Sequence, residues 1–242
     1  MITYVGMLAA NSSDVVGWEA RLEHVMYLIY SELPLVLYMD AFYYSKLTFP
    51  IPANIKIIPF DPEETETFKM IAKYSDLKLG HSRDVKKDTH YYCSLMNAKI
   101  EMVMRAIKDG HVQTSHVAYI DAGISKLFKN KQASFQRLKN VKAETIQKIV
   151  YPGSWPPNIL TVQIQDMYEN PCWVFCGSLL FASVEKMTLF HETCLPIFKE
   201  MLERGYLLWE VNVWPCAVVK MPDEFLWYEG HHDDRMSMVP NN

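Results

Sequence analysis

The sequence predicts an α/β protein in which one domain, residues 1–242, has a mostly parallel, mixed central sheet flanked by helices. Three observations predict this fold class. Apolar runs at 2–8, 35–39, 55–58 and 117–120 have the length and composition of strands buried on both faces. Amphipathic segments with helical spacing separate several of these runs. Strands that alternate with crossover helices are typical of wound, mainly parallel sheets.

Three long amphipathic segments predict helices. The first covers 18–33, after cap and turn residues at 9–14, and ends before Pro34. The second covers 91–108, with Gly110 just beyond it as a C-terminal signal. Ser183 caps the third, which runs to about residue 201 and contains Pro196, so we expect a kink or a break there.

Shorter patterns predict the remaining elements. Residues 63–79 are mixed and polar and favour a helix with a flexible end, whereas 80–88 are charged and predict a surface loop. Strands are expected at 159–165, at 172–182 with a glycine inside, and at 217–219.

The basic stretch at 126–148 has two interpretations. It is a solvated helix with a loop, or a mobile flap whose cations face an anionic ligand. Charge runs usually form solvated faces, so the first interpretation is favoured.

Composition excludes several classes of function. The chain is 50% hydrophobic and 21% charged with a net charge of −4, and no lysine–arginine block is long enough to track phosphates. A nucleic-acid partner is therefore not expected. No apolar run reaches the roughly 20 residues that span a bilayer, and the amino terminus lacks the features of a signal peptide. We expect a soluble, cytoplasmic protein without a transmembrane segment, and the sequence leaves its oligomeric state open.

The cysteines support a reducing compartment. Their number is odd, their surroundings are apolar and no pair has zinc-finger spacing, so buried free thiols are expected. They are Cys93, Cys172, Cys176, Cys194 and Cys216.

A carboxylate directly follows the strand predicted at 117–120. Asp121 ends this apolar run, and the small residues Ala122 and Gly123 follow it. A carboxylate in this position lies at the carboxyl edge of the sheet, where open α/β folds bind ligands. The small residues leave room for a bulky group such as a metal-bound diphosphate. The alternative is that Asp121 only begins a turn or caps the next segment.

Short polar motifs follow one another in a definite order along the chain: Asn97-x-Lys99, the strand that ends in Asp121-x-Gly123, Phe-Cys-Gly-Ser at 175–178, Trp209-Glu210 and a late histidine. This order resembles that of GT-A fold glycosyltransferases. In detail the chain resembles the HtrL/YibB-like group, in which an apolar strand running into Asp-x-Gly-Ile is typical. The resemblance covers most of the chain through short motifs.

The resemblance implies an enzyme that moves a sugar from a nucleotide-diphosphate sugar donor to a glycan or another hydroxyl acceptor. It implies that Mn²⁺ or Mg²⁺ bridges the two phosphates and stabilises the charge that grows on the leaving group. Asp121 would ligate the metal, and His231 or His232 would return to the metal or the diphosphate. Many GT-A enzymes have Asp-x-Asp here, whereas this chain has Asp121-Ala122-Gly123. Either one carboxylate suffices, or metal dependence is weakened.

The resemblance also implies a catalytic carboxylate and an acceptor site. Glu210 follows Gly205 and matches the acidic residue that begins a helix opposite the reactive carbon of the donor. In an inverting enzyme this carboxylate deprotonates the acceptor hydroxyl, and in a retaining enzyme it orients the acceptor or stabilises positive charge. Trp209 would stack on a sugar, although a place in the core is the more common fate of a tryptophan, and Gly177 and Ser178 would lie near the acceptor.

The remaining assignments concern the donor. Lys99 and Arg83 would neutralise phosphates, and residues 9–11 would contact the nucleotide because they follow the first strand. The full set expected to bind the nucleotide sugar is Ala9, Ala10, Asn11, Arg83, Asn97, Lys99, Tyr119, Asp121, Ala122 and Gly123.

Two other classes compete with a glycosyltransferase. The missing second aspartate favours a catalytically degenerate module that binds nucleotide sugars, while the retained Glu210 and the His-His-Asp-Asp tail argue against it. A hydrolase of sugar phosphates lacks a recognisable nucleophile elbow or carboxylate cluster. The sequence does not distinguish an inverting from a retaining enzyme.

Overall fold

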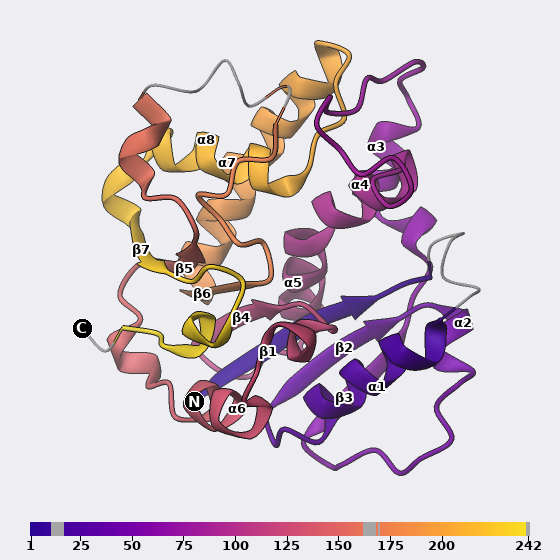
Figure 1. Ribbon diagram of the computed structural model, residues 1–242, viewed down its shortest axis with the longest axis vertical. Coiled ribbons are helices and arrows are strands. Elements are labelled where there is room, and N and C mark those ends of the chain that lie inside the picture. Colours follow the sequence, from indigo (N-terminus) through magenta and orange to yellow (C-terminus); the bar gives the residue numbers. More distant parts are fainter. Residues whose placement is uncertain (11–16, 162–167, 169, 241–242) are drawn as a thin grey trace.

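The protein has the predicted α/β architecture with a mixed, mostly parallel sheet (Figure 1). The computed structural model describes residues 1–10, 17–161, 168 and 170–240. Its seven-stranded sheet has the order β3-β2-β1-β4-β6-β5-β7. The strands are β1 Ile2–Leu8, β2 Leu35–Met39, β3 Ile55–Pro59, β4 His116–Ile120, β5 Ile149–Gly153, β6 Leu179–Ser183 and β7 Phe225–Glu229.

Strand direction changes at β6. β1 pairs in parallel with β2 and β4, β2 with β3, and β5 with β7. β6 runs antiparallel to both β4 and β5. Every residue of β1, β2 and β5 is buried, as expected for strands covered on both faces.

Helices cover both faces of the sheet. The α-helices are α1 Trp18–Ile29, α2 Ala41–Tyr44, α3 Glu66–Ile71, α4 His90–Asn97, α5 Lys99–Lys108, α6 Lys131–Lys139, α7 Val184–Glu203 and α8 Glu210–Lys220. The 3₁₀ helices are η2 Pro62–Glu64, η3 Ile124–Leu127, η4 Ala143–Thr145, η5 Pro157–Thr161, η7 Pro222–Glu224 and η8 Asp234–Ser237. Buried side chains of α5, α7 and α8 belong to one hydrophobic cluster, and those of α1 and α6 belong to another.

Helix boundaries follow local capping, with two departures from expectation. The Thr89 hydroxyl caps α4 and the Ser183 hydroxyl caps α7, as is usual for these residue types. The helix predicted at 91–108 is divided into α4 and α5 at Ala98. α7 continues past Pro196 as one helix, so it is not broken there.

The strand predictions fail mainly beyond residue 145. Residues 217–219 lie inside α8, and 157–161 form η5, while 162–165 lie outside the described residues. The strand expected at 172–182 begins only at Leu179. β5 and β7 were not predicted, because a five-residue strand that pairs with a distant segment carries little local signal.

The chain reverses its direction of winding between β1 and β4. After β1 it adds β2 and β3 on one side, then returns through α3, α4 and α5 to place β4 on the other side of β1. β1 and β4 therefore form a switch point, and open α/β folds have a ligand-binding crevice at the carboxyl edge of such a point.

Candidate active site

A cavity of about 330 Å³ occupies the crevice between β1 and β4. Its walls include residues 7–9 at the end of β1, the first turns of α1, and residues 121–124 after β4. Ser178 and the loop residue Lys87 complete parts of the wall. The sheet topology therefore places this cavity where open α/β folds bind ligands.

Asp121 is the carboxylate that the described residues present to this cavity. Its backbone N–H donates to the carbonyl of Ser178 at 2.9 Å, which extends the pairing of β4 with β6 by one residue. The Tyr119 hydroxyl donates to Asp121 Oδ1 at 2.6 Å. The side chain stays 30% exposed, so a ligand in the cavity can reach it.

Lys99 joins Asp121 to Glu210 behind the cavity wall. Its Nζ lies 2.6 Å from Glu210 Oε1, 2.9 Å from the carbonyl of Gly177 and 3.2 Å from Asp121 Oδ1. The side chains of Lys99 and Glu210 are only 2% and 5% exposed. A single buried ammonium thus holds carboxylates from β4 and α8, which are distant in sequence.

Gly177 is required for this arrangement in two ways. Its φ of 67° lies in the left-handed region, which glycine adopts without strain. A Cβ at this position would lie 2.6 Å from Glu210 Oε1. A larger residue would therefore push Glu210 away from Lys99.

The three charges shift one another's pKa values. Burial tends to raise the pKa of Asp121, but the Lys99 ammonium and the hydrogen bonds from Tyr119 and Ser178 hold it below its ordinary value. Burial raises the pKa of Glu210, and Lys99 only partly offsets this. Burial tends to lower the pKa of Lys99, but the two carboxylates outweigh that effect and raise it. Fully ionised, the cluster carries a net charge of −1.

Cations surround the rest of the cavity. Arg21 comes from α1, Lys87 from the loop before α4, and Lys126 from η3. Burial lowers the pKa of Lys126; the attraction of Asp121 opposes this, and repulsion from Lys87 and Arg21 adds to it. Clustered cations that repel one another are complementary to an anionic ligand.

The start of α1 adds a partial positive charge to the same wall. Gly17 precedes the helix with a φ of 92°, and no described side chain caps the helix. The first N–H groups of a helix have no partner inside it, and they attract anions. Gly17 and Ala20 both line the cavity.

Several residues predicted to bind the donor lie on or beside the cavity. Ala9, Tyr119, Asp121, Ala122 and Gly123 line it, as does Ser178. Ala10 follows directly, and its N–H donates to Asp40 Oδ2 at 2.6 Å. Asn11 lies outside the described residues. Lys99 lies behind the wall and reaches the cavity through Asp121.

Other predicted residues lie away from the cavity wall. Asn97 Nδ2 donates to the carbonyls of Cys93 and Leu208 at 2.8 and 2.7 Å. Arg83 lies in a turn, 3.5 Å from the carbonyl of Gly80. Trp209 is 6% exposed and packs against Gly80, so its indole belongs to the core.

His231 bonds within the carboxyl-terminal segment, whereas His232 contacts the loop before β6. His231 Nε2 lies 2.6 Å from Glu229 Oε1. His232 Nε2 lies 3.2 Å from the carbonyl of Cys176, and its ring packs edge-on against Trp173. Both histidines have positive φ values, 45° and 51°, an uncommon backbone conformation for non-glycine residues. Neither lines the cavity.

Sequence reasoning missed most of the cavity's cations. Lys126 was assigned to a solvated face, Lys87 to a surface loop, and Arg21 was not singled out. Arg21 and His24 are three residues apart on the helix that follows β1. Their spacing places them on one face of that helix, and this could have indicated that both line the ligand site. Lys87 and Lys126 come from segments without periodicity, so only tertiary structure brings them together.

Comparisons with known proteins add no family to this geometry. No protein-family model matches the chain, and no curated protein matches it. None of the helices in the described parts of the chain is long and apolar enough to cross a membrane.

Proposed function

We propose that the protein is a glycosyltransferase that uses a nucleotide-diphosphate sugar as donor and a glycan or another hydroxyl compound as acceptor. One observation carries this proposal: the cavity at the β1–β4 switch point combines a single reachable carboxylate with cations on three separate elements. A ligand that fits must be anionic and large enough to contact both strand ends. A nucleotide diphosphate has both properties.

The charges of the cavity match a diphosphate. Arg21, Lys87 and Lys126 bring three positive charges to the cavity, although Lys87 Nζ also lies 3.9 Å from Asp88 Oδ1. The Asp121–Lys99–Glu210 cluster adds a net charge of −1 when it is fully ionised. Phosphate oxygens that approach these cations relieve their mutual repulsion. The N-terminus of α1, which no described side chain caps, adds N–H donors to the same wall.

A divalent cation fits this site only with help from the ligand. Within the described residues no cluster of three or more histidine, cysteine, aspartate or glutamate side chains could hold a metal. Asp121 would supply one oxygen and the phosphates the others, a pattern that Mg²⁺ and Mn²⁺ accept. A bound cation would stabilise charge on the leaving diphosphate. Mn²⁺ or Mg²⁺ therefore remains part of the proposal, with Asp121 as its protein ligand.

Glu210 has a supporting position in the observed arrangement. It bonds Lys99, and Lys99 in turn bonds Asp121, so Glu210 fixes the carboxylate that faces the ligand. To deprotonate an acceptor hydroxyl, as the resemblance implies, Glu210 would have to leave Lys99 and reach the cavity. If it does so, Glu210→Gln lowers turnover by about 10²–10⁴, the usual contribution of a positioned base. If Glu210 only positions Lys99, donor affinity falls as well.

A nucleotide-sugar-binding module without catalysis is the second candidate. The burial of Glu210 and the pairing of Asp121 with Lys99 favour it, because both carboxylates are already bound to the same ammonium. It shares the donor site with the transferase, so binding alone does not distinguish the two. Transfer of sugar from a donor panel to a glycan panel does. The cytoplasm is the proposed compartment for either candidate, consistent with the free cysteines.

Methionine methyl groups allow a direct test of donor binding. Met7 and Met96 line the cavity, so ¹³C-labelled methionine reports on ligands bound there. We expect nucleoside diphosphates, added with and without Mg²⁺, to shift these two signals saturably. A ligand at about 100 times its dissociation constant should also stabilise the fold by about 2.7 kcal/mol. Unchanged Met7 and Met96 signals with every nucleoside diphosphate would overturn the proposal.

A further inference from the structure

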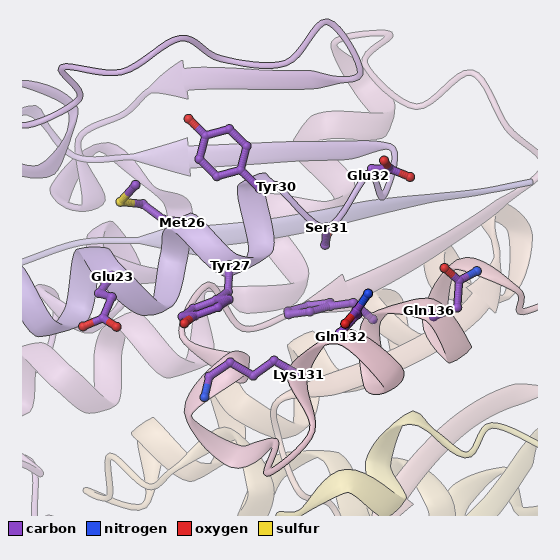
Figure 2. A pocket seen from close by; sticks show the side chains of 10 residues that line it. Glu23, Met26, Tyr27, Tyr30, Ser31, Glu32, Lys131, Gln132 and Gln136 are labelled. Carbon is purple, nitrogen blue, oxygen red and sulfur yellow. The ribbon is translucent and has the colours of Figure 1, made fainter.

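A second hollow, of about 590 Å³, lies between α1 and α6 and away from the cationic cavity (Figure 2). We call it the α1–α6 groove. Tyr27 of α1 and Tyr30, the residue directly after α1, line it and are 45% and 48% exposed, which is unusual for such large rings. Phe135 of α6 is buried and adds a third aromatic ring to the lining.

The aromatic walls are fixed by their surroundings. Lys131 reaches across from α6, and its Nζ lies 5.1 Å from the centre of the Tyr27 ring (Figure 2). The Tyr30 hydroxyl donates to the carbonyl of Pro50 at 3.2 Å, and its ring packs 5.9 Å from Phe49. Rings held in this way lose little conformational freedom when a ligand binds.

Polar groups alternate with these rings along the groove. Gln132 and Gln136 offer amides, and Ser31 and Glu23 add a hydroxyl and a carboxylate. Ser31 Oγ donates to the carbonyl of Leu28 at 2.6 Å and accepts from the N–H of Leu33 at 3.4 Å, so the two glutamine amides are the main hydrogen-bonding groups for a ligand. The groove therefore presents apolar ring surfaces beside several hydrogen-bonding groups.

The charges of the groove nearly balance, so they do not favour an anionic ligand. Glu23 and Glu32 oppose Lys131, and Glu32 is also paired with Lys139. This balance contrasts with the cation-rich cavity at the sheet edge. A ligand that suits the groove is uncharged, has flat C–H surfaces for the rings and has many hydroxyls for the amides. A neutral sugar chain has all three properties.

We infer that the α1–α6 groove is a second carbohydrate-binding site, which holds a neutral oligosaccharide. The two hollows have different lining residues but lie along the same helix: Ala20 lines the cavity and Tyr27 lines the groove, about 10 Å apart at 1.5 Å per residue. Lys126 and Lys131, on the following segment, line the cavity and the groove respectively. The groove therefore binds a distal part of the glycan acceptor. The assignment of the bound sugar chain to the acceptor rests on the proposed transferase function. The binding of a neutral sugar chain to the groove does not depend on that function.

Met26 lines the groove, whereas Met7 and Met96 line the cavity. One ¹³C-methionine spectrum therefore reports on both hollows separately. Maltotriose, cellotriose and chitotriose serve as probes of neutral chains with different linkages. We expect at least one of them to shift the Met26 signal saturably in the absence of any nucleotide.

Tyr27→Ala removes one wall, and it should weaken oligosaccharide binding by about tenfold, as expected for an aromatic anchor. Tyr44→Ala is the matched control, because Tyr44 is 44% exposed and lines neither hollow. It should leave affinity unchanged.

Three outcomes would overturn the inference: no saturable Met26 shift with any of the three probes, equal affinity in Tyr27→Ala, or equal losses in both tyrosine variants. The two proposals fail separately. Nucleoside diphosphates that shift Met7 and Met96 while no oligosaccharide shifts Met26 would overturn the groove alone. Oligosaccharides that shift Met26 while no nucleoside diphosphate shifts Met7 and Met96 would support the groove and overturn the donor site.

Discussion

Lys99 binds both carboxylates of the candidate site and thereby fixes their positions. An ammonium with 2% exposure has lost almost all of its hydration, and only close anions compensate for this. Glu210 and Asp121 provide that compensation from different parts of the chain. The same contacts pull Asp121 toward the protein and leave part of its side chain in the cavity.

Replacing Lys99 tests this dependence. In Lys99→Met, Glu210 stays buried without its partner, so we expect a loss of about 3–5 kcal/mol in the free energy of unfolding. Adding Glu210→Gln removes the uncompensated charge and should restore part of that loss. Urea unfolding of the two single variants and the double variant measures both effects. A Lys99→Met protein as stable as the wild type would contradict the assignment.

The pKa of Asp121 makes its contribution to stability depend on pH. Its folded pKa lies below the ordinary value of 3.8, so the unfolded chain takes up a proton first as pH falls. The stabilisation is present above pH 3.8 and is lost as pH falls through the folded pKa. Asp121→Asn should therefore be less stable than the wild type by about 1–3 kcal/mol at neutral pH. The difference should shrink toward zero in acid, and a difference independent of pH would contradict this account.

The sequence predicted the position of a site residue that directly follows a strand. It did not predict the positions of site residues that come from loops or from separate helices. Asp121 follows a buried run, so its place at the sheet edge follows from the sequence alone. The partnership of Lys99 with Glu210 was not predicted, because it joins α5 to α8 across the core. Trp209 resembled a sugar platform, but it is buried against Gly80.

At the scale of elements, the cavity depends on three segments that meet only in the fold. α1, the loop before α4, and η3 contribute Arg21, Lys87 and Lys126. The repulsion between these cations destabilises the ligand-free protein, and a bound anion relieves it, which adds to the binding affinity. The site is thus assembled by elements whose own sequences show no motif.

Removing one of these cations should weaken ligand binding without lowering the free energy of unfolding. Lys126→Ala takes away a charge that its neighbours repel, so the free energy of unfolding should stay the same or rise. The affinity for a nucleoside diphosphate should fall by about tenfold, corresponding to one charge-assisted hydrogen bond of about 1.5–3 kcal/mol. Lys129→Ala is the control, because Lys129 is exposed and does not line the cavity. Calorimetry that shows equal affinity for the two variants would contradict the cation cluster.

The carboxyl-terminal segment is more deeply packed than its polar sequence suggests. Met236 is fully buried and accepts a hydrogen bond from the Tyr228 hydroxyl at 2.6 Å. Asp234 receives the N–H groups of Lys129 and Asn130, and the Ser134 hydroxyl. The resemblance implied that His231 or His232, in this polar run, returns to the metal or the diphosphate. The structure instead fixes η8 against α6, because Asp234 satisfies backbone donors just before that helix.

Asp234→Ala should therefore destabilise the protein without touching the cavity. It leaves two N–H groups and one hydroxyl without their acceptor, and the expected loss is about 1–3 kcal/mol in the free energy of unfolding. Nucleotide affinity should stay unchanged at temperatures where the variant remains folded. Thermal unfolding and nucleotide titration on this variant test the two statements. A variant with normal stability and weak nucleotide binding would instead support closure over the donor.

For the whole molecule, β4 and β6 unite the chain into one sheet. β4 pairs with β1 on one side and with β6 on the other, so the β4–β6 ladder joins the strands of residues 2–120 to those of residues 149–229. Both hydrophobic clusters include side chains from each of these stretches. The early βαβ alternation made the fold class predictable, and the later strands were obscured because their partners are remote in sequence.

This architecture predicts a single cooperative unfolding transition. Neither part of the chain can keep its core or its sheet edge when the other unfolds, and the Lys99–Glu210 pair links them through the interior. Methyl signals of Met7 and Met39 report on the early strands, and those of Met187 and Met201 report on α7. All four should disappear at one urea concentration, coincident with the loss of far-ultraviolet circular dichroism. In Lys99→Met all four midpoints should fall together, whereas separate midpoints for the two parts would show that they unfold independently.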